Sequence, residues 1–172
     1  MTSTLIGRSL PLEALATTEA DYVQLGETSA RTELWDGGVL ACPRDTPRHQ
    51  MILSALGNAL RANRADLNVI AGVPVHLGPG RIAVPDLIIA GTIDPDQPLV
   101  DARSVRLVCE ITSPTSATVD WSLKMHAYAQ AGIPCYLVAE PERGLLHSYM
   151  LSAQGYVEQS VMQLVRVTGL NL

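Results

Sequence analysis

The stretch AVPDLIIA, residues 83–90, places an acid in a run that otherwise suits the interior of a sheet. Its large and branched apolar side chains favour a buried strand, and Pro85 immediately precedes the acid Asp86. A lone buried carboxylate is costly or takes up a proton. We therefore expect Asp86 either to begin its strand, capped by backbone N–H groups, or to meet a cation in the core.

A second apolar strand, VRLVCEI at residues 105–111, also carries an acid near its end. Strand alternation predicts one face of four apolar side chains: Val105, Leu107, Cys109 and Ile111. Glu110 falls on the other face, so it meets Asp86 if the two strands are neighbours. Two close anions repel unless a proton or a cation lies between them, and a hard divalent ion such as magnesium suits oxygen ligands. The alternative is an ordinary ion pair from Glu110 to Arg81 or Arg106.

A lysine and a third acid extend this group. Asp120, Lys124 and Tyr128 are spaced i, i+4, i+8 in a predicted helix, so they share one face. If the helix packs on the sheet, Lys124 points at the acids, where it orients water and offsets charge on a phosphate. The alternative is an exposed Lys124–Asp120 pair. Glu33, just before a hairpin turn, is positioned to complete the metal shell.

The rest of the chain alternates helices and strands. The predicted helices are a short one in 17–27, an amphipathic one at 49–67 and one from about 116 to 132. The predicted strands are a hairpin in 31–43 and the segments 68–78, 81–91, 105–111, 133–140, 144–151 and 155–167. We expect one α/β domain over residues 1–172, of the α+β kind, with a central mixed sheet flanked by helices. Residues 1–16 read as an N-terminal arm, and the abrupt ending GLNL predicts that a few C-terminal residues are missing.

Composition limits the partners and the compartment. The 172 residues carry a net charge of −5, without the basic excess typical of a strong nucleic-acid binder. Three cysteines without a C-x-x-C pair favour the reducing cytoplasm. The N-terminus lacks the pattern of a signal peptide, and no apolar run approaches the roughly 18 residues of a membrane helix. We therefore expect no membrane contact.

The ordered motifs resemble a known family: TELWDGGVL, TPRHQMI, VPDLIIA, LVCEITSPTS, VDWSLKMHAYAQAGIP and CYLVAE. Over about residues 18–141 they resemble the Uma2 (DUF820-like) restriction-type endonucleases of the PD-(D/E)XK nuclease superfamily. The resemblance implies a restriction-endonuclease-like core and divalent-metal-dependent cleavage of DNA. It also implies that Asp86 and Glu110 are metal ligands, that Glu33 is a further acid of the site, and that Lys124 is the catalytic lysine.

The chain departs from the superfamily pattern at two places. Thr112 stands where the lysine usually follows the second acid, so the lysine is assigned to the next helix. Leu137 replaces a Trp common in the matching strand of the family, which we interpret as a packing change.

Three residues beside the proposed site have weaker assignments. His49 lies where the resembling sequences place a His; it packs or caps the helix, or contacts a substrate phosphate. Ser113 enters the next helix within reach of the site, and Tyr128 belongs to the core or to the site's surroundings.

These residues predict an endodeoxyribonuclease. Asp86 and Glu110, with a backbone carbonyl near Ile111, hold Mg²⁺ or Mn²⁺, which activates water and polarises the phosphate. DNA is the expected substrate, and a homodimer is plausible because cutting both strands requires two sites. Two alternatives remain: an inactive binding module on a nuclease fold, in keeping with the acidic net charge, and a hydrolase that uses the acid pair for proton transfer.

Overall fold

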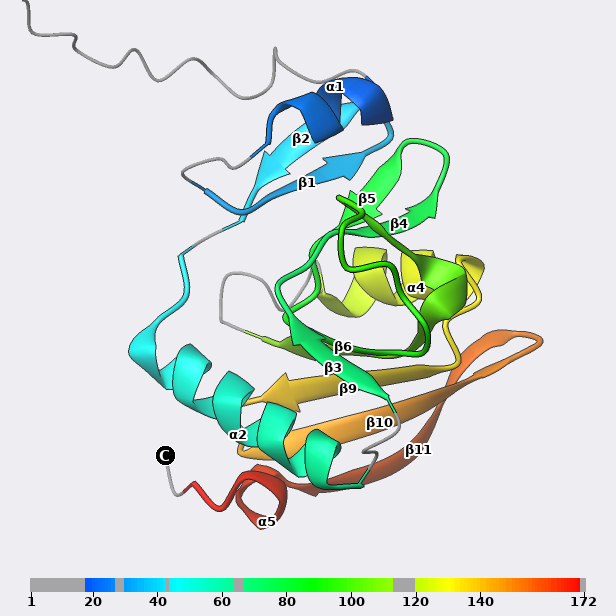
Figure 1. Cartoon of the computed structure of the whole chain (residues 1–172). Coiled ribbons are helices and arrows are strands. Elements are labelled where there is room, and N and C mark those ends of the chain that lie inside the picture. Colours follow the sequence, from blue (N-terminus) through cyan, green and yellow to red (C-terminus); the bar gives the residue numbers. More distant parts are fainter. Residues whose placement is uncertain (1–17, 27–29, 43, 64–66, 113–119, 171–172) are drawn as a thin grey trace, which may run out of the picture.

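The computed structural model of the chain describes residues 18–26, 30–42, 44–63, 67–112 and 120–170 (Figure 1). Three predicted features therefore lie outside the described residues: the arm of residues 1–16, Ser113, and the chain end at 171–172. Within the described ranges, mixed sheets are flanked by helices, which confirms the predicted α+β class. The expected single central sheet is instead two sheets.

The larger sheet has six strands in the order β11-β10-β9-β8-β6-β3. Their bounds are β3 Asn68–Ala71, β6 Leu87–Ala90, β8 Val105–Ile111, β9 Cys135–Glu140, β10 Leu145–Ser152 and β11 Gly155–Gln163. The pair β8–β9 is parallel and the other neighbouring pairs are antiparallel. Successive residues alternate between two apolar clusters, with Ile88 and Val108 in one and Leu87 and Cys109 in the other. The sheet is therefore buried on both faces at β6 and β8.

The smaller sheet has five strands in the order β2-β1-β5-β4-β7. Their bounds are β1 Thr32–Trp35, β2 Gly38–Ala41, β4 Val75–Gly78, β5 Arg81–Ala83 and β7 Val100–Asp101. The β1–β2 hairpin turns at Asp36 and Gly37, whose φ angles are 48° and 89°. A two-residue hairpin turn of this hand requires positive φ at both positions, which the Asp-Gly pair supplies. The predicted hairpin is thus present.

Helices cover the larger sheet from both sides (Figure 1). They are α2 Pro47–Asn63, α4 Met125–Gln130, which follows the π-helical turn η3 Asp120–Lys124, and α5 Leu164–Thr168; a 3₁₀ turn η2 lies at Ala102–Ser104. The remaining helix, α1 Glu19–Gln24, packs Tyr22 against the smaller sheet. α2 packs Ile52 and Leu56 against one face of the sheet, in the cluster that also holds Leu164 of α5. α4 packs Ala127 and Tyr128 against the other face.

Two segments predicted as single strands, 68–78 and 81–91, each pass from one sheet to the other. β3 and β6 pair in the larger sheet, whereas β4 and β5 pair in the smaller one. Gly72, with φ 62°, lies at the first break and Pro85 at the second. Glycine adopts the left-handed conformation without strain, and proline cannot donate to a strand ladder. Asp86 therefore lies at the break directly before β6 and not inside a strand.

Two further expectations were wrong. The segment 155–167 ends as a strand at Gln163 and continues as α5, which Gly169 terminates with φ 68°. Val105 does not share a face with Cys109, because the β6–β8 register shifts between Ile89 and Ala90. An extra residue in one strand moves the side chains beyond it to the opposite face.

Candidate active site

Asp86 is buried, with 2% of its surface exposed, and binds three donors. Oδ1 accepts a hydrogen bond from Arg31 Nη1 at 2.8 Å, and Oδ2 accepts one from the Ile111 backbone N–H at 2.7 Å. His49 Nε2 lies 3.2 Å from Oδ2. Burial raises the pKa of Asp86, but the bond to His49 and the charge of Arg31 outweigh it and lower the pKa to about 2. The carboxylate is thus held ionised in the core by cationic side chains as well as by one backbone cap.

Lys124 joins two other buried acids. Its Nζ lies 3.0 Å from Glu33 Oε1 and 3.1 Å from Glu110 Oε1, and its side chain is 6% exposed. Tyr128 donates its hydroxyl to the same Glu110 oxygen at 2.6 Å. The alternative of an exposed Lys124 is therefore wrong. Arg81, one of the partners considered for Glu110, pairs instead with Asp36.

Glu33 is held by the smaller sheet and its neighbours. Oε1 accepts a hydrogen bond from the Val84 backbone N–H at 2.9 Å, and Oε2 accepts one from Trp35 Nε1 at 3.1 Å. Both carboxylate oxygens are therefore fixed, and Oε1 also faces Lys124. Because a buried carboxylate needs such partners, the hairpin that carries Glu33 is tied to the segment that precedes Asp86.

The topology explains how these residues meet. β6 and β8 are antiparallel with Leu87 opposite Cys109, so the next position along each strand brings Asp86 beside Glu110. Asp86 in turn accepts the bond from the residue after Glu110. Lys124 is the last residue of the π-helical turn η3, and such turns recur at functional sites. The structure thus places Asp86 beside Glu110 and joins Glu110 to Glu33 through Lys124, while their roles as metal ligands and catalytic lysine stay predictions.

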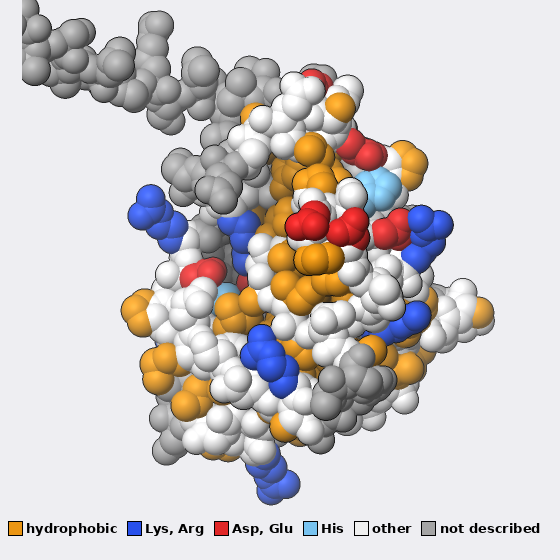
Figure 2. Space-filling view, viewed as in Figure 1, with side chains coloured by type: hydrophobic (Ala, Val, Ile, Leu, Met, Phe, Trp, Pro, Cys, Tyr) orange, Lys and Arg blue, Asp and Glu red, His pale blue; other side chains and the backbone are white. Residues whose placement is uncertain are grey.

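His49 lies in the first turn of α2 and connects Asp86 to another acid. Its Nδ1 is 3.7 Å from Asp45 Oδ1, and its Nε2 faces Asp86. Burial lowers the pKa of His49, but the bond to Asp86 and the charges of Asp86 and Asp45 outweigh it, so the pKa is raised. In the space-filling view, acidic, basic and histidine side chains lie close together between the β1–β2 hairpin and the start of α2 (Figure 2).

The donor atoms around Asp86 fit a divalent cation. Ligand atoms of Asp45, His49 and Asp86 lie within 4.8 Å of one another. Carboxylate oxygens and imidazole nitrogens are common ligands of such ions, and three buried carboxylates face two fixed cations, Arg31 and Lys124. Asp86 therefore belongs to two candidate ligand sets: the predicted one with Glu110 and this one with His49.

Sequence reasoning missed Arg31 and Asp45. Arg31 precedes Glu33 by two residues, and Asp45 precedes His49 by four, the spacing of neighbours on a helix. The spacing of Asp45 and His49 could have indicated from sequence that the two residues are neighbours. The position of Arg31 indicated nothing about the site until the structure placed the hairpin beside Asp86.

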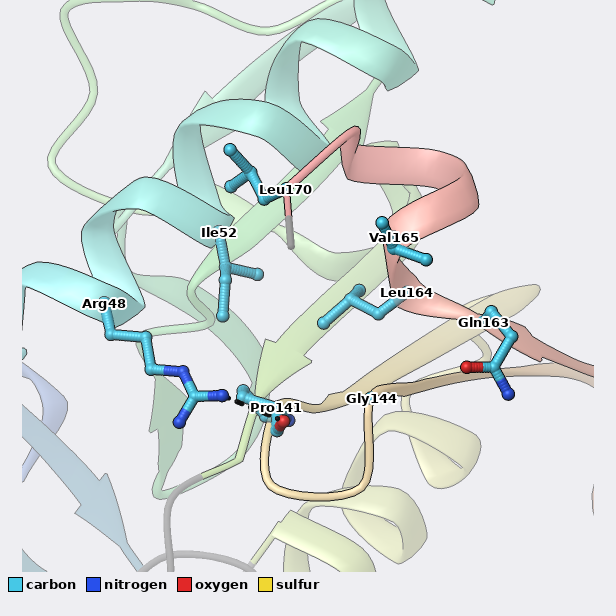
Figure 3. A pocket seen from close by; sticks show the side chains of 8 residues that line it. All are labelled: Arg48, Ile52, Pro141, Gly144, Gln163, Leu164, Val165 and Leu170. Atoms are coloured by element: carbon cyan, nitrogen blue, oxygen red, sulfur yellow. Dashed lines mark hydrogen bonds between the residues drawn. The ribbon is translucent and has the colours of Figure 1, made fainter. Parts of the chain in front are cut away.

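A cavity of about 130 Å³ lies apart from the carboxylates, between α2, the β9–β10 turn and α5 (Figure 3). Its lining is mostly apolar: Arg48, Ile52, Pro141, Gly144, Gln163, Leu164, Val165 and Leu170. Arg48 Nη2 donates to the Pro141 carbonyl at 3.3 Å across its edge. The cavity contains none of the acids of the site, so it does not mark the place of the chemistry.

Comparison with known proteins gives the family and the fold. A family model described as "Uma2: Putative restriction endonuclease" matches residues 19–171. A solved structure described as "a putative nuclease belonging to DUF820 from Anabaena variabilis ATCC 29413" is similar, with a TM-score of 0.66 and 15% identity, over 84% of this chain and 82% of that one. No curated protein matches the chain. Among the described residues, no helix has the length and hydropathy to cross a membrane.

Proposed function

The chain belongs to the Uma2 family, and from this premise we propose that it is a divalent-metal-dependent endonuclease that hydrolyses phosphodiester bonds in DNA. One observation carries the proposal. Glu33, Asp86 and Glu110 are buried at 3% exposure or less and meet around Lys124 and Arg31. A soluble fold rarely buries three carboxylates together unless they serve a site.

The proposed ligands are Asp86 and Glu110, helped by a backbone carbonyl near Ile111. Mg²⁺ or Mn²⁺ bound there lowers the pKa of a water molecule and polarises the scissile phosphate. His49 and Asp45 supply the alternative ligands at Asp86.

The chain's own residues prepare this site. Lys124 lies between Glu33 and Glu110 and offsets part of their negative charge. Tyr128 orients Glu110 through its hydroxyl, and the Ile111 N–H orients Asp86. Fixed dipoles and charges of this kind need little rearrangement when the reaction begins, which is the main source of catalytic power in such sites.

Several finer features belong to the proposal. The match over residues 19–171 supports one nuclease domain over the chain. The three free cysteines are in keeping with a cytoplasmic protein, and cutting both strands of a duplex favours a homodimer.

An inactive binding module on the same fold is the second candidate. The observation in its favour is that Arg31 and Lys124 already balance two of the three negative charges of Asp86, Glu33 and Glu110 without an ion. In a hydrolase that used the acids for proton transfer, Asp86 could not be the general acid, because its pKa is lowered and not raised.

A plasmid-nicking assay tests the proposal. We expect the parent to nick supercoiled DNA with Mn²⁺ and to stop when chelator is added, and we expect Asp86→Ala and Lys124→Ala to lose activity. Arg103→Ala is the matched control, because Arg103 is 88% exposed and pairs only locally with Asp101. A parent that binds DNA and Mn²⁺ without cutting supports the binding module instead.

A further inference from the structure

The two fixed cations of the site differ in access. The Lys124 side chain is 6% exposed and lies between two carboxylates, whereas the Arg31 side chain is 27% exposed. A molecule that approaches Asp86 from solvent therefore meets the Arg31 side chain before the Lys124 side chain.

Arg31 also has hydrogen-bonding capacity to spare. Its Nη1 donates to Asp86, but within the part of the chain that the structure describes its Nε is buried and has no hydrogen-bond partner. Buried donors are rarely left unsatisfied in proteins, and those that are call for an explanation. A ligand oxygen beside Asp86 would supply the missing acceptor.

The backbone of Arg31 is also fixed beside Asp86. The Arg31 carbonyl accepts a hydrogen bond from the Cys42 N–H at 2.7 Å, so the residue is tied to the far end of the β1–β2 hairpin. Its planar set of donors matches the oxygens of a phosphate group, which it binds through two parallel hydrogen bonds.

We propose that Arg31 is the phosphate-binding residue of this site and contacts a non-bridging oxygen of the scissile phosphodiester. The inference rests on the proposed function in taking a nucleic-acid phosphodiester as the ligand. The two cations then have different roles. Lys124 holds the acids in place, and Arg31 offsets the negative charge of the substrate phosphate.

Binding of duplex DNA in Ca²⁺, followed by fluorescence anisotropy over a range of salt concentrations, tests this role without cleavage. For Arg31→Met we expect affinity to fall about tenfold, and the slope of log K against log salt to fall by about one, as for loss of one phosphate contact. Arg103→Met, which removes an exposed arginine, should change neither. An unchanged affinity and slope in Arg31→Met would overturn the proposal.

Arg31→Lys keeps a positive charge near Asp86 but lacks the planar donors, so it tests the proposal even if Arg31→Met does not fold. If Arg31 serves only as the ion-pair partner of Asp86, Arg31→Lys binds DNA like the parent and the proposal fails. If Arg31 binds phosphate, Arg31→Lys binds more weakly. A parent that binds DNA through Arg31 but does not nick plasmid refutes the nuclease function and leaves this inference standing; a parent that binds no DNA refutes both.

Discussion

Replacing Lys124 with methionine tests whether this lysine holds the buried acids together. The substitution keeps most of the side-chain volume and removes the charge that lies 3.0 Å from Glu33 and 3.1 Å from Glu110. Each contact corresponds to about 5 kcal/mol at an effective dielectric constant of about 20, before the cost of burying the charges is subtracted. Removing one partner of a buried ion pair typically costs about 3–5 kcal/mol. Because two acids lose their partner here, we expect the upper part of that range.

Urea unfolding at pH 7 measures the loss. The linear extrapolation gives the free energy of unfolding, and an unchanged slope shows that the unfolded states remain comparable. The double variant Lys124→Met/Glu33→Gln should regain part of the stability, because only one of the two acids that lost the lysine, Glu110, stays charged, and it keeps its bond from Tyr128. Arg103→Met, at an exposed pair, should leave the urea midpoint where it is in the parent.

A loss below about 1 kcal/mol at pH 7 would refute the reasoning, because Lys124 would then contribute no more than an exposed ion pair does.

Three further predictions follow from the same geometry. Asp86→Asn should remove both Mn²⁺ binding, measured by calorimetry, and metal-dependent nicking; undiminished binding would exclude Asp86 as a ligand. Because the pKa of Asp86 is lowered to about 2, its charge stabilises the fold above its unfolded pKa near 3.8, and about 2 kcal/mol should be lost as the pH falls from about 4 to about 2. The free energy of unfolding of Asp86→Asn should not show this loss as the pH falls. A pH dependence that runs parallel to that of the parent would contradict the prediction. Tyr128→Phe should lose about 1–3 kcal/mol in urea unfolding, because it removes a buried donor to a charged oxygen at 2.6 Å, and a neutral effect would show that water replaces the hydroxyl.

Asp86 and Glu110 were predictable because each violates its surroundings, whereas Lys124 was assigned through the order of motifs that resembles the family. A carboxylate at the edge of an apolar strand needs a proton, a cation or a hydrogen-bond donor as partner. Asp86 and Glu110 lie on two such strands with a loop between them, which suggests that they share one partner. Arg31 carried no comparable signal, since an arginine before a strand is ordinary in any soluble protein. Its importance comes from the hairpin's position beside β6, which is a tertiary property.

The division of strands between two sheets was also beyond local pattern. Apolar residues continue through residues 81–91, so periodicity alone cannot show that Pro85 marks a passage from one sheet to the other. The LVRVT segment has the branched residues of a strand but forms α5, where Leu164 packs against Ile52 of α2 and Gly169 ends the helix. Tertiary packing overrides such weak propensities.

The pairing of Glu33 with Lys124 has a consequence for synthesis on the ribosome. The hairpin emerges well before the lysine does, so in the nascent chain Glu33 lacks the cation that pairs with it in the interior. Contacts between segments so distant along the chain form slowly. The protein should accordingly acquire its protease resistance late, after β11 has left the exit tunnel and completed the sheet on which α4 packs.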